Sequence, residues 1–124
     1  MREILFKAKS ISTGEWVYGN YAFTDTNGEQ HFIFQNKAFE HEVDKDTICQ
    51  FTGLTDKNGN KIWENDIIAD KHYKYSVVWD EEEGSWMLET ISRARYGLAG
   101  IGRINSEKFE VIGNVFDNKE LLEE

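Results

Sequence analysis

The sequence predicts a mainly β protein built from twisted antiparallel hairpins in a barrel-like or coiled sheet, followed by a short C-terminal helix. Three observations predict this fold class. Apolar and polar side chains alternate at a period of two, which places them on opposite faces of a strand. Two dipeptides, Asn27-Gly28 and Asn58-Gly59, suit the tight turns between antiparallel strands because both residues tolerate a positive φ. Proline is absent, so no residue of that type confines a strand to a sheet edge.

The alternation locates the strands in order along the chain. Strands are predicted at residues 4–9, 16–19, 32–35, 74–80, 85–91 and 109–116. Tyr75, Val77 and Trp79 share one face of the fourth of these segments. A short polar stretch separates the segments that begin at residues 74 and 85, so these two are predicted to pair as a hairpin.

Two segments have helical features. Asp117 can cap the free amides of a first turn, and Glu120 occupies the capping-box position, so residues 118–124 are predicted to form the C-terminal helix. Leu121 and Leu122 would pack one side of it. A second helical candidate is residues 36–43, where Ala38, Phe39 and Val43 could form one apolar stripe.

Length and composition limit the kind of protein. The chain has 124 residues, the size of one domain, and 40% of them are hydrophobic, enough for a core. A net charge of −9 argues against broad coating of nucleic acid or of an anionic membrane. No apolar run reaches membrane-spanning or signal-peptide length. We therefore expect a single cytoplasmic domain over residues 1–124, with no membrane association.

Three stretches carry a more specific pattern. Residues 50–68 read QFTGLTDKNGNKIWENDII, residues 110–118 read EVIGNVFDN, and the opening segment contains FKA and WVYG. In their order and spacing these stretches resemble the YopX family, small proteins encoded by phages and prophages of Gram-positive bacteria. The family's usual forms are QYTGL, a DKNG turn, an aromatic residue before EGDIV, and a closing EVIGNIYENP. The resemblance spans essentially the whole chain.

The resemblance implies a mainly β protein of phage or prophage origin whose family has no assigned activity, and it transfers no catalytic residue. It does imply structural roles for the matching positions, which are Gln50, Thr52, Gly53, Leu54, Asp56, Asn58, Gly59, Asp66, Gly113 and Asn114. Where the family has glycine before Asp66, this chain has Asn65. Asparagine is the residue besides glycine that best tolerates left-handed geometry, so we expect the turn to persist.

The histidines and the single cysteine do not indicate a metal centre or a catalytic site. His31, His41 and His72 are ten or more residues apart and include no short-spaced ligand pair, so surface imidazoles are favoured over a site shared with nearby aspartates. Cys49 alone excludes an internal disulfide framework and a multi-cysteine zinc site. Its apolar neighbours favour a small buried residue over a nucleophile.

Asp56, Asn58 and Asn60 have the spacing of the first three ligands in a calcium loop. Lys61 and Ile67, however, stand where such a loop needs glycine and glutamate, so a hairpin turn is favoured. No nucleophile elbow and no P-loop occurs. The sequence therefore predicts no catalytic residue, no metal and no cofactor.

The segment at residues 93–103, RARYGLAGIGR, is the candidate for an anion or nucleic-acid contact. Guanidinium groups match phosphate geometry, and a tyrosine can stack on a base. The residues that would make this contact are Arg93, Arg95, Tyr96 and Arg103. The favoured alternative is a loop whose arginines pair with the acidic run at residues 80–83 or with the C-terminal glutamates.

The chain contains four Trp, five Tyr and eight Phe residues, which could fill a core or line a ligand groove. The core is favoured, with Trp16 and Trp63 expected to be half-exposed. The predicted function is a non-catalytic accessory binding or self-assembly module, forming a homo-oligomer or binding a protein partner in the cytoplasm of the bacterial host. Nucleic-acid contact through residues 93–103 is the alternative, and an enzyme or metal protein using dispersed His and Asp residues is the third.

Overall fold

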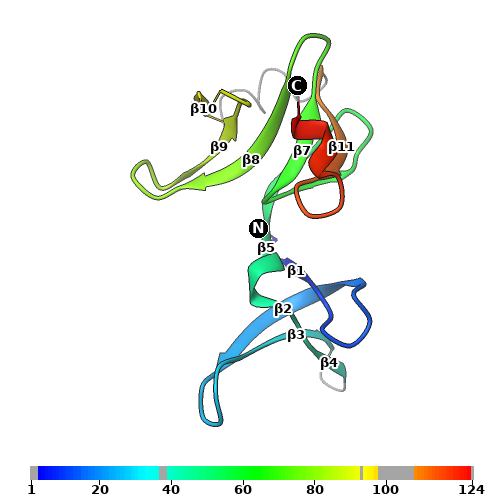
Figure 1. Ribbon diagram of the computed structural model, residues 1–124, viewed down its shortest axis with the longest axis vertical. Coiled ribbons are helices and arrows are strands. Elements are labelled where there is room, and N and C mark those ends of the chain that lie inside the picture. Colours follow the sequence, from blue (N-terminus) through cyan, green and yellow to red (C-terminus); the bar gives the residue numbers. More distant parts are fainter. Residues whose placement is uncertain (1–2, 37–38, 93, 98–107, 124) are drawn as a thin grey trace. The chain divides into compact units, whose positions relative to one another are not determined.

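The computed structural model describes residues 3–36, 39–92, 94–97 and 108–123, and these residues form an antiparallel β protein (Figure 1). The chain divides into two compact units, residues 1–51 and 52–124. Strand β5 (Cys49–Thr55) contains the boundary between them. The prediction of one domain over the whole chain stays a prediction.

The first unit is an antiparallel sheet in the order β4-β3-β2-β1-β5. Its strands are β1 (Phe6–Lys9), β2 (Trp16–Thr24), β3 (Gln30–Asn36), β4 (Phe39–Glu42) and the first residues of β5, with the 3-10 turn η1 (Lys45–Thr47) before β5. The predicted Asn27-Gly28 hairpin is confirmed as the pair β2–β3, in which Tyr21 faces Ile33. Ala8, Val17, Ile33 and Val43 form the core of this unit.

The second unit holds a five-stranded sheet in the order β10-β9-β8-β7-β11 (Figure 1). Its strands are β7 (Asp66–Ala69), β8 (Lys74–Asp80), β9 (Ser85–Glu89), β10 (Arg95–Gly97) and β11 (Glu110–Asn114), while β6 (Lys61–Trp63) lies beside β5. The hairpin predicted from residue 74 onward is confirmed as β8–β9, in which Val77 faces Leu88. Both residues belong to a core completed by Ile62, Ile68 and Phe109.

The predicted mainly β fold of antiparallel hairpins is confirmed, but the barrel-like closure is wrong. Among the described strands, β10 and β11 lie at the two edges of the second sheet, and β4 lies at an edge of the first. A barrel requires its first and last strands to pair. Strands as short as β10, with three residues, offer little backbone for such pairing.

The predicted C-terminal helix is also wrong. Residues Lys119–Leu122 form a single 3-10 turn, η3, which has no side-chain cap. The Asp117 carboxylate, expected to be the cap, accepts a hydrogen bond from Asn114 Nδ2 (3.1 Å), and Asn118 Oδ1 accepts one from Asn114 N (3.1 Å). The polar groups that would start a helix therefore close the turn before it, and a helix of so few residues cannot offset the cost of its own nucleation.

In the second helical candidate, residues 36–43, the structure shows strand β4 at Phe39–Glu42 and no helix among the described residues. Ile33 faces His41 and Phe32 faces Glu42 across the β3–β4 pair. The local helical pattern is overridden because hydrogen bonding to a neighbouring strand outweighs intrinsic propensity. Ala38 lies outside the residues that the structure describes.

The aromatic residues divide between core and surface. The largest fully buried side chains are aliphatic, and Phe51, Trp63 and Phe109 are the buried aromatic residues among those described. Trp16 is half-buried as predicted, whereas the prediction for Trp63 is wrong, because its residue is only 6% exposed. The exposed residues around the Asn58-Gly59 turn end at Lys61. Trp63 is close to this turn in sequence, but it belongs to the next strand and is buried there.

Candidate functional site

Of the four residues predicted to contact an anion or nucleic acid, the structure describes Arg95 and Tyr96. Arg93 and Arg103 lie outside the described residues. Arg95 faces Glu89 and Tyr96 faces Leu88 in the β9–β10 pair. Because successive strand residues point to opposite faces of a sheet, the two side chains do not contribute to one site.

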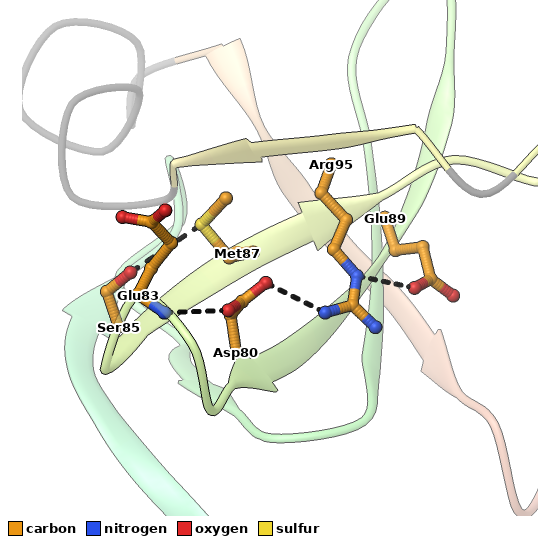
Figure 2. A network of polar contacts seen from close by, with 6 residues as sticks. All are labelled: Asp80, Glu83, Ser85, Met87, Glu89 and Arg95. Atoms are coloured by element: carbon orange, nitrogen blue, oxygen red, sulfur yellow. Dashed lines mark hydrogen bonds and ion pairs between the residues drawn. The ribbon is translucent and has the colours of Figure 1, made fainter.

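The Arg95 guanidinium lies between two carboxylates (Figure 2). Its Nε donates to Glu89 Oε2 at 2.9 Å and its Nη1 donates to Asp80 Oδ2 at 2.9 Å. The hydrogen bond to Asp80, followed by the one to Glu89, raises the pKa of Arg95. Pairing with the acidic run, the alternative favoured from the sequence, is thus what the structure shows for Arg95. A phosphate at Arg95 would compete with two carboxylates that already hold two of the five N–H groups of the guanidinium.

Asp80 joins this guanidinium to the turn between β8 and β9. The N–H of Glu83 donates to Asp80 Oδ1 at 2.9 Å (Figure 2). This hydrogen bond first, and the one from Arg95 second, hold the pKa of Asp80 below its usual value. The side chains of Asp80, Glu89 and Arg95 link the β8–β9 hairpin and its turn to β10, so this network has a structural role.

On the other face of β10, Tyr96 borders a groove of about 490 Å³. The Tyr96 ring meets the Tyr75 ring edge-on, with centroids 6.4 Å apart and an interplanar angle of 86°. Tyr75 in turn lies 6.3 Å from the Tyr73 ring and 5.9 Å from the Phe109 ring. We call this feature the tyrosine groove and define it by its lining residues, which are residues 72–75, residues 90–92, Ala94 and Tyr96.

Two hydrogen-bonded turns hold the walls of the tyrosine groove. Asp70 Oδ1 accepts the N–H groups of His72 and Tyr73, both at 2.8 Å, in the turn between β7 and β8. Across the groove, Thr90 N donates to Ala94 O (2.9 Å) and Ala94 N donates to Thr90 Oγ1 (3.1 Å). These local bonds leave Tyr73 64% exposed and Tyr96 50% exposed at the rim.

The groove also perturbs its titratable groups. Burial first, and the Asp70 carboxylate second, raise the pKa of Tyr75. Burial raises the pKa of Asp70 as well, but the N–H groups of His72 and Tyr73 outweigh it and hold that pKa below its usual value. Tyr75 is therefore a neutral phenol and Asp70 a carboxylate near neutral pH.

A second, more basic cavity adjoins the tyrosine groove and shares His72 with it. This cavity measures about 550 Å³ and is lined by Lys57, Asp70, Lys71, His72 and Lys108. Lys57 Nζ lies 3.7 Å from Glu110 Oε2. The two cavities together place aromatic rings next to ammonium groups, an arrangement that can hold a planar ring and an anion side by side.

The QFTGL–ENDII segment at residues 50–68 meets the EVIGN segment at residues 110–118 through Asp56. Its carboxylate, 5% exposed as a residue, accepts the N–H groups of Asn58, Asn60 and Val111, each at 2.9 Å. Burial raises the pKa of Asp56, but these N–H groups, that of Val111 foremost, outweigh it and lower the pKa below its usual value. Asp56 therefore fixes the Asn58-Gly59 turn and joins it to β11.

Other positions of the same pattern also form local bonds. Thr52 Oγ1 donates to Ile62 O at 2.7 Å, and Asp66 Oδ2 accepts the Trp63 N–H at 2.8 Å. Asn114 Oδ1 accepts the N–H groups of Phe116 and Asp117, both at 2.9 Å. Asn65 has φ 69°, which confirms the left-handed geometry expected there. These bonds shape turns and strand pairs.

The first unit contains a polar relay that the sequence interpretation missed. Tyr21 Oη lies 2.6 Å from His31 Nδ1, and His31 Nε2 lies 2.8 Å from Glu29 Oε1. Glu29 Oε2 is 3.6 Å from Lys45 Nζ. The His31 side chain is 12% exposed, so the expectation of a surface imidazole is wrong for this residue. In the sequence, the signal for this contact was the two-residue spacing of Glu29 and His31.

This relay borders a cavity of about 470 Å³ that both Glu29 and His31 line. Burial first, and the Glu29 charge second, raise the pKa of Tyr21. A phenol with a raised pKa is a poor nucleophile, so the relay orients its side chains and does not activate Tyr21.

The remaining candidate ligands are dispersed. Within residues 3–36, 39–92, 94–97 and 108–123, no three His, Cys, Asp or Glu side chains are grouped closely enough to hold a metal ion. Cys49 is buried as predicted, and its Sγ donates to Thr47 O at 3.2 Å. No helix in the described part of the chain has the length and apolar character needed to span a membrane.

Comparisons with known proteins place these features in context. A family model described as YopX protein matches residues 5–123. The chain is also similar to a solved structure, "Crystal structure of protein EF1440 from Enterococcus faecalis", with a TM-score of 0.61 and 25% sequence identity. That similarity covers 99% of this chain and 100% of the other. A search of curated proteins found no match.

Proposed function

The chain belongs to the YopX family, and from that premise we propose that it is a non-catalytic binding module whose ligand occupies the tyrosine groove. It would serve as an accessory protein of a phage or prophage in the cytoplasm of the bacterial host. One observation carries the proposal: Tyr73, Tyr75 and Tyr96 line one groove, and the first and last are at least half-exposed. Covering such rings is favourable, because an aromatic side chain can bury about 150–250 Å².

The chemistry of the groove favours binding over catalysis. The groups that could transfer protons there are three phenols, two hydroxyls, Lys74 and His72. The raised pKa of Tyr75, due mainly to burial, disfavours its use as a base or nucleophile. Two bordering turns are held by hydrogen bonds before any ligand arrives, which lowers the entropic cost of binding.

Ring NMR of the full chain tests this proposal. Three probes represent three ligand classes: a short oligothymidylate, cellohexaose and poly-L-glutamate. We expect at least one probe to shift the ring resonances of Tyr73 and Tyr96, and the double variant Tyr73→Ser/Tyr96→Ser to lose that binding. Tyr18→Ser is the matched control, because Tyr18 is 47% exposed in the first unit. If none of the probes moves these resonances, or if the double variant binds as before, the proposal fails.

Self-association is a second proposal, and the first unit favours it. Phe39 on the edge strand β4 is 61% exposed, and Phe23 near the end of β2 is 52% exposed. Large exposed apolar side chains at a sheet edge favour contact with a second copy. Sedimentation at micromolar concentration should show a dimer or larger species that Phe39→Ser weakens. A strict monomer at every concentration would contradict self-association.

A further inference from the structure

We infer that the ligand of the tyrosine groove is single-stranded nucleic acid, with bases stacked on Tyr73 and Tyr96 and phosphates held by Lys71 and Lys108. This inference rests on the proposed function of the groove. It differs from the contact predicted through residues 93–103, because Arg95 faces the opposite side of the sheet and is paired with carboxylates.

The rings provide a stacking platform. Tyr75 is the fixed member, since it contacts the rings of Tyr73, Tyr96 and Phe109 at centroid distances of 6.3, 6.4 and 5.9 Å. The two outer tyrosines are therefore supported from below while they stay 64% and 50% exposed. Unpaired bases expose their faces for stacking on aromatic side chains, whereas a duplex covers them.

The charges beside the platform suit a phosphate backbone. Lys57, Lys71 and Lys108 line the cavity that shares His72 with the groove, in a chain whose net charge is −9. Two acidic groups are close by, but each has its own partners. The Asp70 carboxylate accepts two backbone N–H groups, and Glu110 lies 3.7 Å from Lys57.

Lys74 of the groove is half-buried, so Lys71 and Lys108 are the exposed ammonium groups best placed for an anionic ligand. Both are exposed, and within the described part of the chain neither takes part in an ion pair. The positive charge is local, so we expect contacts with a short segment of nucleic acid, not the coating of a long one.

Other ligand classes fit the site less well. A neutral saccharide is usually held by carboxylates and amides around its ring, but the hydrogen-bonding side chains that line the groove are hydroxyls, Lys74 and His72. An acidic peptide would satisfy the lysines but would leave the exposed ring faces of Tyr73 and Tyr96 uncovered. Single-stranded nucleic acid uses both features at once.

Fluorescence anisotropy of a labelled oligothymidylate with the full chain tests the inference. Two phosphate contacts to a single strand predict a log–log salt slope of about −1.4. We expect Tyr73→Ala and Tyr96→Ala each to weaken binding about fivefold or more, from the loss of one stacked base. The double variant Lys71→Gln/Lys108→Gln should weaken binding at low salt and bring the slope close to zero.

Arg95→Gln is the matched control, because it removes a cation from β10, the strand that carries Tyr96, but on the opposite face. It should leave the affinity for oligothymidylate unchanged. Equal binding of a duplex, or binding that both tyrosine variants retain in full, would overturn the inference. If oligothymidylate fails to bind while cellohexaose or poly-L-glutamate shifts the Tyr73 and Tyr96 rings, the inference fails and the groove proposal stands. If all three probes fail, both fall.

Discussion

Two charged side chains of the second unit, Asp56 and Arg95, each hold several hydrogen bonds, but in different surroundings. Asp56 is 5% exposed, and three of its partners are backbone N–H groups. The Arg95 side chain is 42% exposed, and its partners are two carboxylates. Water can replace the partners of Arg95, whereas the N–H groups around Asp56 have no comparable substitute.

The difference shows that the number of polar contacts does not measure their contribution to stability. The Arg95 network is conspicuous because it joins opposite charges across three strands and a turn (Figure 2). Asp56 holds one turn and one strand together with a single carboxylate. We expect the second arrangement to contribute more to the stability of the unit than the Arg95 network does.

Replacing Asp56 should have the largest effect. Asp56→Ala leaves the N–H groups of Asn58, Asn60 and Val111 without their acceptor, so we expect the free energy of unfolding to fall by about 3 kcal/mol or more. Urea unfolding followed by tryptophan fluorescence measures it, because three of the four tryptophans, Trp63, Trp79 and Trp86, belong to the second unit.

The Asp56→Asn variant serves as the graded control for this change. An amide keeps one oxygen, which can still accept the N–H groups of Asn58 and Asn60, but it turns a donor toward the N–H of Val111. We expect the free energy of unfolding of Asp56→Asn to lie between that of the wild type and that of Asp56→Ala. An Asp56→Ala variant as stable as the wild type would show that water satisfies this turn, and the comparison with Arg95 would then break down.

Acid should unfold the second unit through the same carboxylate. Because the N–H groups outweigh burial, the pKa of Asp56 is lower in the folded state than in the unfolded state, where it is about 4. The folded state then binds fewer protons, so this stabilisation is complete above about pH 4 and is lost as pH falls through the folded pKa. Urea midpoints measured from neutral pH downward should decline in this range, and less steeply in Asp56→Asn.

The turn backbone itself should contribute less than the carboxylate. Gly59 has φ +82°, and a Cβ added there would meet no heavy atom within 4 Å. Gly59→Ala therefore changes only the backbone preference, at a cost of about 1 kcal/mol, and Gly59→Asn should cost less because asparagine tolerates this region. Urea unfolding of the three proteins measures both. A Gly59→Ala loss larger than that of Asp56→Ala would reverse the expected order.

Replacing Arg95 should have the smallest effect on stability. Arg95→Gln removes two ion pairs in which the Arg95 side chain is 42% exposed, so water can reach the site, and the glutamine amide can still donate to one of the two carboxylates. Asp80 also still accepts the N–H of Glu83, and the hairpin keeps its backbone bonds. We expect a small decrease in the urea midpoint at low salt and none at high salt, where the charges are screened. A loss that persists at high salt and equals that of Asp56→Ala would contradict the ranking.

The sequence alone was sufficient where structure depends on neighbours along the chain. The β2–β3 and β8–β9 hairpins follow from period-two alternation and turn residues. The left-handed Asn65 was expected because the YopX pattern has glycine at that place and asparagine tolerates the same geometry. The C-terminal segment was predicted wrongly for a related reason. Asp117 has the character of a cap, but the neighbouring turn uses its carboxylate first.

The candidate site required more than local pattern. From the sequence, Tyr96 and Arg95 were grouped because they are adjacent, yet strand geometry separates them onto opposite faces. Tyr73 and Tyr75 were not named as site residues, since the groove exists only when β8, β9 and β10 align in register. The Tyr21–His31 contact likewise depends on the pairing of β2 with β3.

The family and an antiparallel β protein with defined hairpins can be inferred from the sequence, because its motifs, alternation and turn chemistry act over a few residues. The tertiary structure was needed to show that the described strands form open sheets, that Asp56 joins a turn to β11, and that three tyrosines line one groove. These outcomes bring together residues from separate strands. Their distances are set by strand order and register, which no short stretch of sequence encodes.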